Sequence, residues 1–116
     1  MATALEIVNK FSQTHDRSLL ADDFRFIGPV DQVEGIDAFM KLNAEFFPTV
    51  KDVRMLQQFE NGDNACSIYE MDLMMPGGDI LTLKVADWAV IENGKLKEQR
   101  IYYDAREYAA AVQQQA

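Results

Sequence analysis

The sequence predicts an α+β fold in which two amphipathic helices precede an antiparallel sheet. Apolar residues recur at helical spacing in residues 3–15 and again in residues 35–47. From residue 50 onward, apolar and polar residues alternate, as expected for strands that bury one face. The pair Asn93-Gly94 separates two such alternating runs, and it is a strong β-hairpin signal because both residues tolerate a positive φ.

Length, composition and charge restrict the class of protein. The 116 residues favour a single domain, residues 1–116, which is large enough to bury a core. Hydrophobic residues make up 48% of the chain and charged residues 26%, as in ordinary globular proteins. A formal net charge of -8 repels phosphate backbones and anionic lipids. We therefore expect neither a nucleic acid nor a membrane as a partner.

Few residues are available for metal or cofactor chemistry. Cys66 and His15 are the only cysteine and histidine, so no clustered zinc or iron ligands are expected. The glycine pair Gly77-Gly78 precedes a strand rather than a helix, which argues against a phosphate-binding loop. We predict no cofactor and no metal. The N-terminus lacks a basic segment followed by an apolar run, which predicts a cytoplasmic protein, although a mature secreted form would look the same.

The first helix is expected to begin after Thr3, with Glu6 completing a capping box. Its apolar stripe consists of Ala4, Ile7, Val8 and Phe11. His15 follows one turn after the stripe, so it either looks into the interior or lies at the helix end, where an imidazole meets the C-terminal dipole. We expect the second position and keep His15 as a candidate catalytic residue.

A brief strand at residues 24–27 is expected next, ended by Gly28-Pro29. The second helix should run from Gly35 to Phe47, and Pro48 ends it. Its apolar stripe consists of Ile36, Phe39, Met40, Phe46 and Phe47. Phe39 and Met40 are either core residues or ligand contacts.

Three strands are expected between residues 50 and 91. The first should place Val53, Met55, Gln57 and Phe59 on one face. If the Pro76–Gly78 loop sets Leu73 opposite Leu81, then Glu70 faces Lys84 on one side of the sheet. On the other side Tyr69 meets Val85, and Ser67 meets Asp87. This register pairs opposite charges and gathers the apolar side chains on one face.

Two registers are open for the last hairpin. A two-residue turn at Asn93-Gly94 would place Asp87 opposite Arg100 and form an internal ion pair. A three-residue loop with a bulge would place Asp87 beside Gln99 and Ile101 instead. We expect the second, because it sends Arg100 to the side that holds Glu70 and Lys84.

Asp87 is the principal candidate site residue, because it is a lone carboxylate in an apolar stretch. Desolvation of a carboxyl group that faces an apolar cavity raises its pKa, which allows it to donate a hydrogen bond or a proton. The alternative is that Asp87 pairs with Arg100, Ser67 or a backbone amide. Tyr69 and Tyr103 share its face and either donate hydroxyl groups to a ligand or pack in the ordinary way.

Three segments, LLADDFRFIGPV, EGIDAFMKLNAEFF and VADWAVIENGKLKEQRIYYD, resemble the nuclear transport factor two-like superfamily. The SnoaL-like cyclases, ketosteroid isomerases and limonene epoxide hydrolases are the most similar members. The resemblance covers nearly the whole chain. It implies a cystatin-like cone: a strongly curved antiparallel sheet wrapped around the N-terminal helices, with a hydrophobic pocket and a dimer through the outer sheet face.

The family's functional residues match only in part. Ala86-Asp87-Trp88 occupies the place where ketosteroid isomerases hold a protonated aspartate in their oxyanion hole. The isomerase base belongs to an acidic-Pro-Val motif, where this chain has Gly28. The hydrolase pattern has Arg and Asp where this chain has Val85 and Ile101.

The sequence thus predicts a protein that binds a compact, mostly apolar, oxygen-bearing molecule. Asp87 is the expected polar anchor, and the expected pocket residues are Phe39, Met40, Tyr69, Ile101 and Tyr103. One alternative is a cyclase-, isomerase- or hydrolase-type enzyme that uses Asp87 as general acid, assisted by His15. Another is a non-catalytic interaction domain. A homodimer is expected through an outer face that includes Ile68, Glu70, Lys84, Trp88 and Arg100.

Overall fold

The computed structural model describes residues 2–113, which form three α-helices and one six-stranded sheet. The helices are α1 (Ala4–Thr14), α2 (Ile36–Phe46) and α3 (Ala105–Gln113). The strands are β1 (Leu20–Ile27), β2 (Gln32–Glu34), β3 (Val50–Asn61), β4 (Asn64–Met74), β5 (Ile80–Glu92) and β6 (Lys95–Tyr102). Among the described residues, no helix combines the length and the apolarity needed to cross a bilayer.

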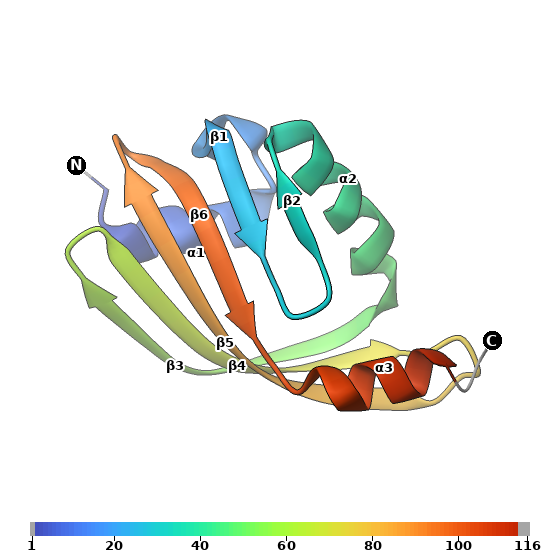
Figure 1. The fold of residues 1–116 in the computed structure, drawn as a ribbon. Coiled ribbons are helices and arrows are strands. Elements are labelled where there is room, and N and C mark those ends of the chain that lie inside the picture. The colour runs from blue at the N-terminus through green and yellow to red at the C-terminus, as the bar shows by residue number, and fades with distance from the viewer. Residues whose placement is uncertain (1, 114–116) are drawn as a thin grey trace.

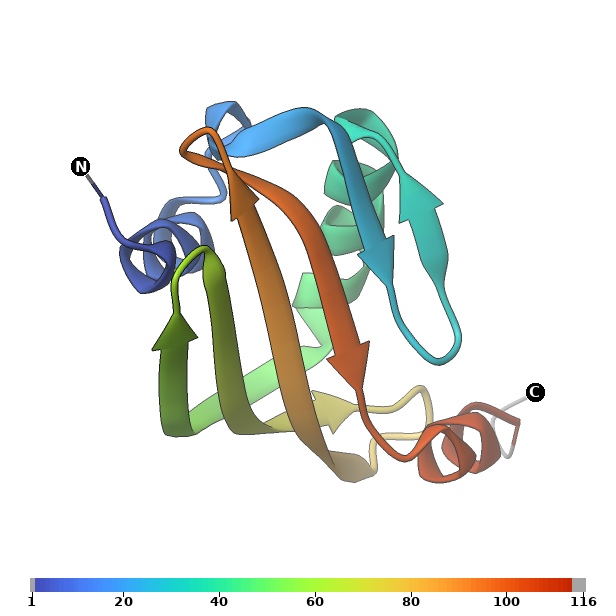
Figure 2. The same ribbon diagram turned by 60° about the vertical axis from the view of Figure 1, so that its left-hand side comes forward.

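The sheet has the strand order β2-β1-β6-β5-β4-β3 and is strongly curved (Figures 1 and 2). Helices α1 and α2 lie on its concave side, and α3 lies near the far end of β4 and β5 (Figure 1). The β1–β6 pairing is parallel, and the other four pairings are antiparallel. The sheet is therefore mixed rather than wholly antiparallel, because β1 joins the free edge of β6 in the same direction.

Both predicted N-terminal helices are present. Thr3 caps α1, and its side chain and that of Glu6 form the expected capping box. Helix α2 starts after Gly35, whose φ of 91° suits glycine, and a short 3₁₀ turn at Phe47–Thr49 follows it. These local signals position the two apolar stripes on the concave side of the sheet.

Strand β3 departs from the predicted alternation. A register shift between Met55 and Gln57 leaves Leu56 as an extra residue, so Met55 pairs with Tyr69 but Gln57 pairs with Ile68. The prediction that Val53, Met55, Gln57 and Phe59 share one face is therefore wrong. The bulge changes the face of every side chain that follows it, and it bends the edge strand.

The last hairpin combines features of both registers. Asn93 and Gly94 form a two-residue turn with φ values of 53° and 77°, so the predicted three-residue loop is wrong. A bulge in β6 nevertheless restores the expected pairing, because Ile91 pairs with Leu96 and Val90 with Glu98. Asp87 consequently lies opposite Ile101 and not opposite Arg100.

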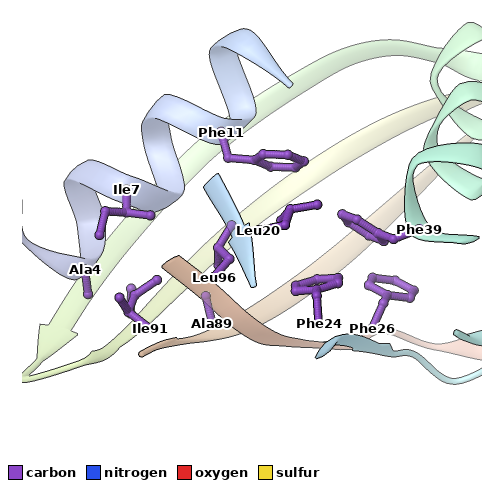
Figure 3. Close-up of a cluster of buried hydrophobic side chains, with 11 residues drawn as sticks. Ala4, Ile7, Phe11, Leu20, Phe24, Phe26, Phe39, Ala89, Ile91 and Leu96 are labelled. Carbon is purple, nitrogen blue, oxygen red and sulfur yellow. The ribbon is translucent and has the colours of Figure 1, made fainter. Parts of the chain in front are cut away.

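Two clusters of buried side chains form the core. The first joins α1, β1 and α2 to one end of the sheet, and Figure 3 shows Phe11, Phe24, Phe26 and Phe39 converging there. The ring centroids of Phe24 and Phe39 are 4.5 Å apart. The second cluster lies on β4 and β5 and comprises Met71, Leu73, Met75, Leu83 and Val85. The space between these clusters is where the candidate site lies.

Candidate functional site

A cavity of about 140 Å³ lies between the concave face of the sheet, α2 and α3. Among the residues that the structure describes, seven aromatic side chains line it: Phe26, Phe39, Phe46, Phe47, Tyr69, Tyr103 and Tyr108. The other lining residues are Gly28, Asp31, Leu42, Asn43, Met71, Leu83, Gln99 and Ile101. Of these residues, Asp31 and Phe47 are exposed to solvent, and Phe47 is 41% exposed. These two residues mark the mouth of the cavity. The walls are apolar and aromatic, with a small number of polar groups.

Asp87 lies behind one wall of the cavity. It occupies an inward position of β5, where each alternate residue from Leu83 to Ile91 is buried, and only 8% of Asp87 is exposed. Its Oδ2 atom accepts hydrogen bonds from Tyr69 Oη at 3.1 Å and from Gln99 Nε2 at 2.7 Å. Both donors line the cavity, whereas Asp87 does not. The Asp87 carboxylate therefore influences the cavity indirectly, because it orients the side chains of Tyr69 and Gln99.

The surroundings of Asp87 shift its ionisation. Burial raises the pKa of the carboxyl to about 6, and the hydrogen bonds from Gln99 and Tyr69 lower it in part. Burial and the nearby Asp87 charge also hold the pKa of Tyr69 well above its ordinary value. At pH 7 most Asp87 side chains are thus ionised and Tyr69 keeps its proton. This end of the cavity then offers the lone pairs of Tyr69 and of the Gln99 amide oxygen, together with the second N–H of Gln99. Asp87 becomes a proton donor as the pH falls through about 6.

The structure brings most of the predicted pocket residues together. Phe39, Tyr69, Ile101 and Tyr103 all line the cavity. Met40 is not among the lining residues and packs against the first core cluster instead. Successive residues of an α-helix point about 100° apart around its axis. Because Met40 directly follows Phe39 in α2, its side chain points away from the cavity that Phe39 lines.

His15 lies at the end of α1, in the left-handed conformation, with its backbone N–H bonded to Phe11 O. Its ring stacks on Phe47 at a centroid distance of 4.5 Å. Among the described residues, no hydrogen bond joins His15 to Asp87, and His15 does not line the cavity. The two candidate catalytic residues are therefore not brought together. His15 meets the site through Phe47 and, by way of Phe11, through Phe39.

Several site residues carried no strong sequence signal. Asp31 and Gly28 come from the loop between β1 and β2, whose ends are joined by a hydrogen bond from Gly28 N to Asp31 O at 2.8 Å. Gly28 approaches Ile101 so closely that an added Cβ would lie 3.2 Å from Ile101 Cγ1. Gly28 thus contributes only backbone atoms to the cavity wall, and Asp31 supplies the carboxylate at the mouth of the cavity. Gln99 was recognised as a neighbour of Asp87 but not as a lining residue.

The predicted outer-face residues do share one face of the sheet. Glu70 pairs with Lys84, and Trp88 pairs with Arg100, whose guanidinium carbon lies 5.7 Å from the Trp88 ring centroid. Ile68 pairs with Ala86 on the same face. Trp88 is 41% exposed, so an apolar surface with charges of both signs lies opposite the cavity.

Across residues 2–113, no three His, Cys, Asp or Glu side chains gather closely enough to hold a metal ion.

The chain resembles several known proteins. The family model of the SnoaL-like domain matches residues 7–99. No curated protein matches the chain at a significant level.

Three solved structures share the fold. An NTF2-like protein of unknown function from Cytophaga hutchinsonii is 22% identical, with a TM-score of 0.78 over 94% of this chain and 96% of that one. A proposed SnoaL-like polyketide cyclase from Jannaschia sp. CCS1 is 19% identical, with a TM-score of 0.79 over 94% and 90%. A proposed isomerase from Rhodopseudomonas palustris is 14% identical, with a TM-score of 0.77 over 98% of each chain.

Proposed function

The chain belongs to the SnoaL-like domain family, and we propose that it binds a compact, mostly apolar molecule that carries a hydroxyl group. The observation that carries this proposal is the buried Asp87 behind a cavity with apolar walls. A pocket that binds a small molecule is typically apolar and contains a few convergent polar groups. At the Asp87 end of the cavity these polar groups are Tyr69 and Gln99, which Asp87 holds in place.

The chemistry of this end of the cavity favours a ligand that donates a hydrogen bond. Tyr69 donates a hydrogen bond to Asp87 through its hydroxyl, so the lone pairs of its oxygen face the cavity. Gln99 uses one N–H on Asp87 and keeps its amide oxygen as an acceptor and its second N–H as a donor. A ligand hydroxyl can donate to either acceptor while its apolar body packs against Phe39 and Ile101.

The binding test compares 4-ethylphenol with ethylbenzene, which lacks the hydroxyl group. In the wild type at pH 7.5, we expect 4-ethylphenol to bind more tightly. In Asp87→Asn we expect about a tenfold loss of 4-ethylphenol affinity, because a hydrogen bond in a network with a charged group contributes roughly 1.5 kcal/mol. The affinity for ethylbenzene should change little. Titration calorimetry or ligand-observed NMR measures each affinity.

Asp79→Asn is the matched control, because Asp79 is exposed and lies in the loop between β4 and β5. It should keep the wild-type affinities. Equal loss of both compounds in Asp87→Asn would show a general packing defect rather than a polar anchor. Equal affinity of wild type and Asp87→Asn for 4-ethylphenol would reject the anchor.

Catalysis is a second candidate function, and the pKa of Asp87 near 6 favours it. A group with such a pKa exchanges a proton readily near neutral pH. Two relatives of similar fold are described as a cyclase and an isomerase. If the protein turns over a hydroxyl-bearing ligand, its rate should follow the ionisation of Asp87, and Asp87→Asn should abolish that pH dependence.

We also propose that the outer sheet face joins two copies of the chain. Exposed apolar residues on it include Phe59 and Trp88. Tyr102, which pairs with Ala86 on the same face, is 53% exposed. Lys84 and Glu70 lie on the same face, so a two-fold axis can bring opposite charges together. An apolar face of this kind is uncommon on a monomer.

Sedimentation equilibrium tests the dimer. The wild type should be dimeric at micromolar concentration, and Trp88→Asp should shift it to the monomer because it would bury an unpaired charge in the interface. Val53→Asp is the control, since Val53 is exposed and pairs with Met71, on the opposite face of the sheet from Trp88. A wild-type monomer at this concentration would refute the proposal.

A further inference from the structure

The charges around the cavity all have one sign. Of the described residues that line it, Asp31 alone is charged, and Asp87 lies directly behind Tyr69 and Gln99. No Lys, Arg or His among the described residues lines the cavity. The whole chain carries a formal net charge of -8. An anionic ligand would therefore meet two carboxylates and no compensating cation, whereas a cationic ligand would be attracted.

The mouth of the cavity combines a carboxylate with aromatic rings. Asp31 is exposed there and makes no ion pair with any described residue. The pKa of Tyr103 is raised to about 12, chiefly by burial and then by the nearby Tyr108 and Asp31, so the Asp31 carboxylate lies near this phenol. The rings of Tyr103 and Tyr108 meet edge to face, with centroids 6.1 Å apart. Aromatic faces beside a carboxylate are the usual surroundings of a bound ammonium group.

The size of the cavity limits the apolar part of the ligand. Its volume is about 140 Å³. An apolar cavity of roughly 150 Å³ accommodates one benzene ring. A single ring therefore fills the enclosed space, and any further substituent has to project through the mouth, past Asp31 and Phe47.

We propose that the cavity takes a small aromatic amine in its ammonium form, with one ring between the aromatic walls and the ammonium group beside Asp31. This rests on the proposed function, which places the ligand's hydroxyl group at the Tyr69 and Gln99 end. The ligand is thus a one-ring phenol or alcohol whose side chain carries a protonated amine. The cation gains from the Asp31 carboxylate and from the faces of Tyr103 and Tyr108.

Three probes with the same phenol ring test the proposal. Tyramine carries an ammonium group, 4-ethylphenol is neutral, and 3-(4-hydroxyphenyl)propionate carries a carboxylate. For the wild type at pH 7 and low salt, calorimetry should show tyramine binding roughly tenfold more tightly than 4-ethylphenol, and the propionate binding most weakly. The preference for tyramine should shrink in 0.5 M NaCl, because Asp31 is exposed and salt screens its charge.

Two variants identify Asp31 as the source of the preference. In Asp31→Asn the ratio of tyramine to 4-ethylphenol affinity should fall towards one, and in Asp31→Lys the propionate should bind more tightly than tyramine. Asp79→Asn, an exposed site in the β4–β5 loop, should keep the wild-type ratio. Equal binding of the three probes by the wild type would overturn the cation preference while leaving the proposed function intact. A wild type that binds none of them would overturn both.

Discussion

At pH 8 the free energy of unfolding of Asp87→Asn should exceed that of the wild type by roughly 1–3 kcal/mol. The pKa of Asp87 in the folded chain is about 6, against an ordinary value of 3.8. A difference of about two pKa units corresponds to roughly 3 kcal/mol. Asn keeps an oxygen that can accept from Tyr69 and Gln99, but its new N–H groups also need partners, which reduces the gain.

The direction of this effect follows from proton binding. Between about pH 4 and pH 6 the folded chain holds a proton on Asp87 that the unfolded chain has released. The contribution of Asp87 to stability therefore falls as the pH rises through this window, and the penalty is complete above it. The stability advantage of Asp87→Asn should accordingly grow from pH 4 to pH 7. Urea unfolding curves of both proteins across this range measure it.

Asp72→Asn provides a control of opposite sign. The pKa of Asp72 is lowered to about 2, chiefly by its hydrogen bonds with Arg54 and then by that with Thr82. Its ionised form therefore stabilises the fold, and this contribution is lost as the pH falls from about 4 towards 2. Asp72→Asn should destabilise the protein at pH 7.

A loss of stability in Asp87→Asn at pH 8 would contradict the view that the buried charge of Asp87 lowers the free energy of unfolding.

Among the substitutions considered, the largest loss of stability should come from truncating a buried side chain of the first core cluster. Leu20 is 1% exposed and packs among the buried residues that join β1 to the helices (Figure 3). Leu20→Ala should lower the free energy of unfolding by about 2–5 kcal/mol, because it removes buried methyl groups and leaves a cavity. Denaturant unfolding followed by circular dichroism measures the change.

Leu56→Ala is the chemically matched control, because Leu56 is 57% exposed at the bulge in β3. Its effect should stay within about 0.5 kcal/mol, as is usual for surface positions. Similar losses in the two variants would mean that the β3 edge is covered in solution, by a second copy or by another chain.

Local signals were sufficient for most elements of the fold. The capping box at Thr3, the two helical stripes and the Asn93-Gly94 turn depend on residues close in sequence, and all three are present. The β4–β5 register was also predictable, since Glu70 and Lys84 pair as expected. In each case nearby residues fix the hydrogen bonds or the face that is buried.

The candidate site was predictable only in part. Phe39, Tyr69, Ile101 and Tyr103 were recognisable as pocket residues because each lies on an apolar face. The role of Asp31 was not recognisable, because a carboxylate in a loop has no periodicity that indicates where it points. Its position depends on how the β1–β2 loop folds back over the sheet, which is a long-range property.

Residue patterns within short stretches of the chain were enough to predict the α+β class, the placement of the N-terminal helices and an inward position for Asp87. Contacts between distant segments set the bulges in β3 and β6, the parallel pairing of β1 with β6 and the approach of Asp31 to the cavity. Side-chain periodicity depends on backbone geometry and can be read over a few residues. A bulge or a loop position depends instead on packing between distant segments, where small differences in free energy select one arrangement.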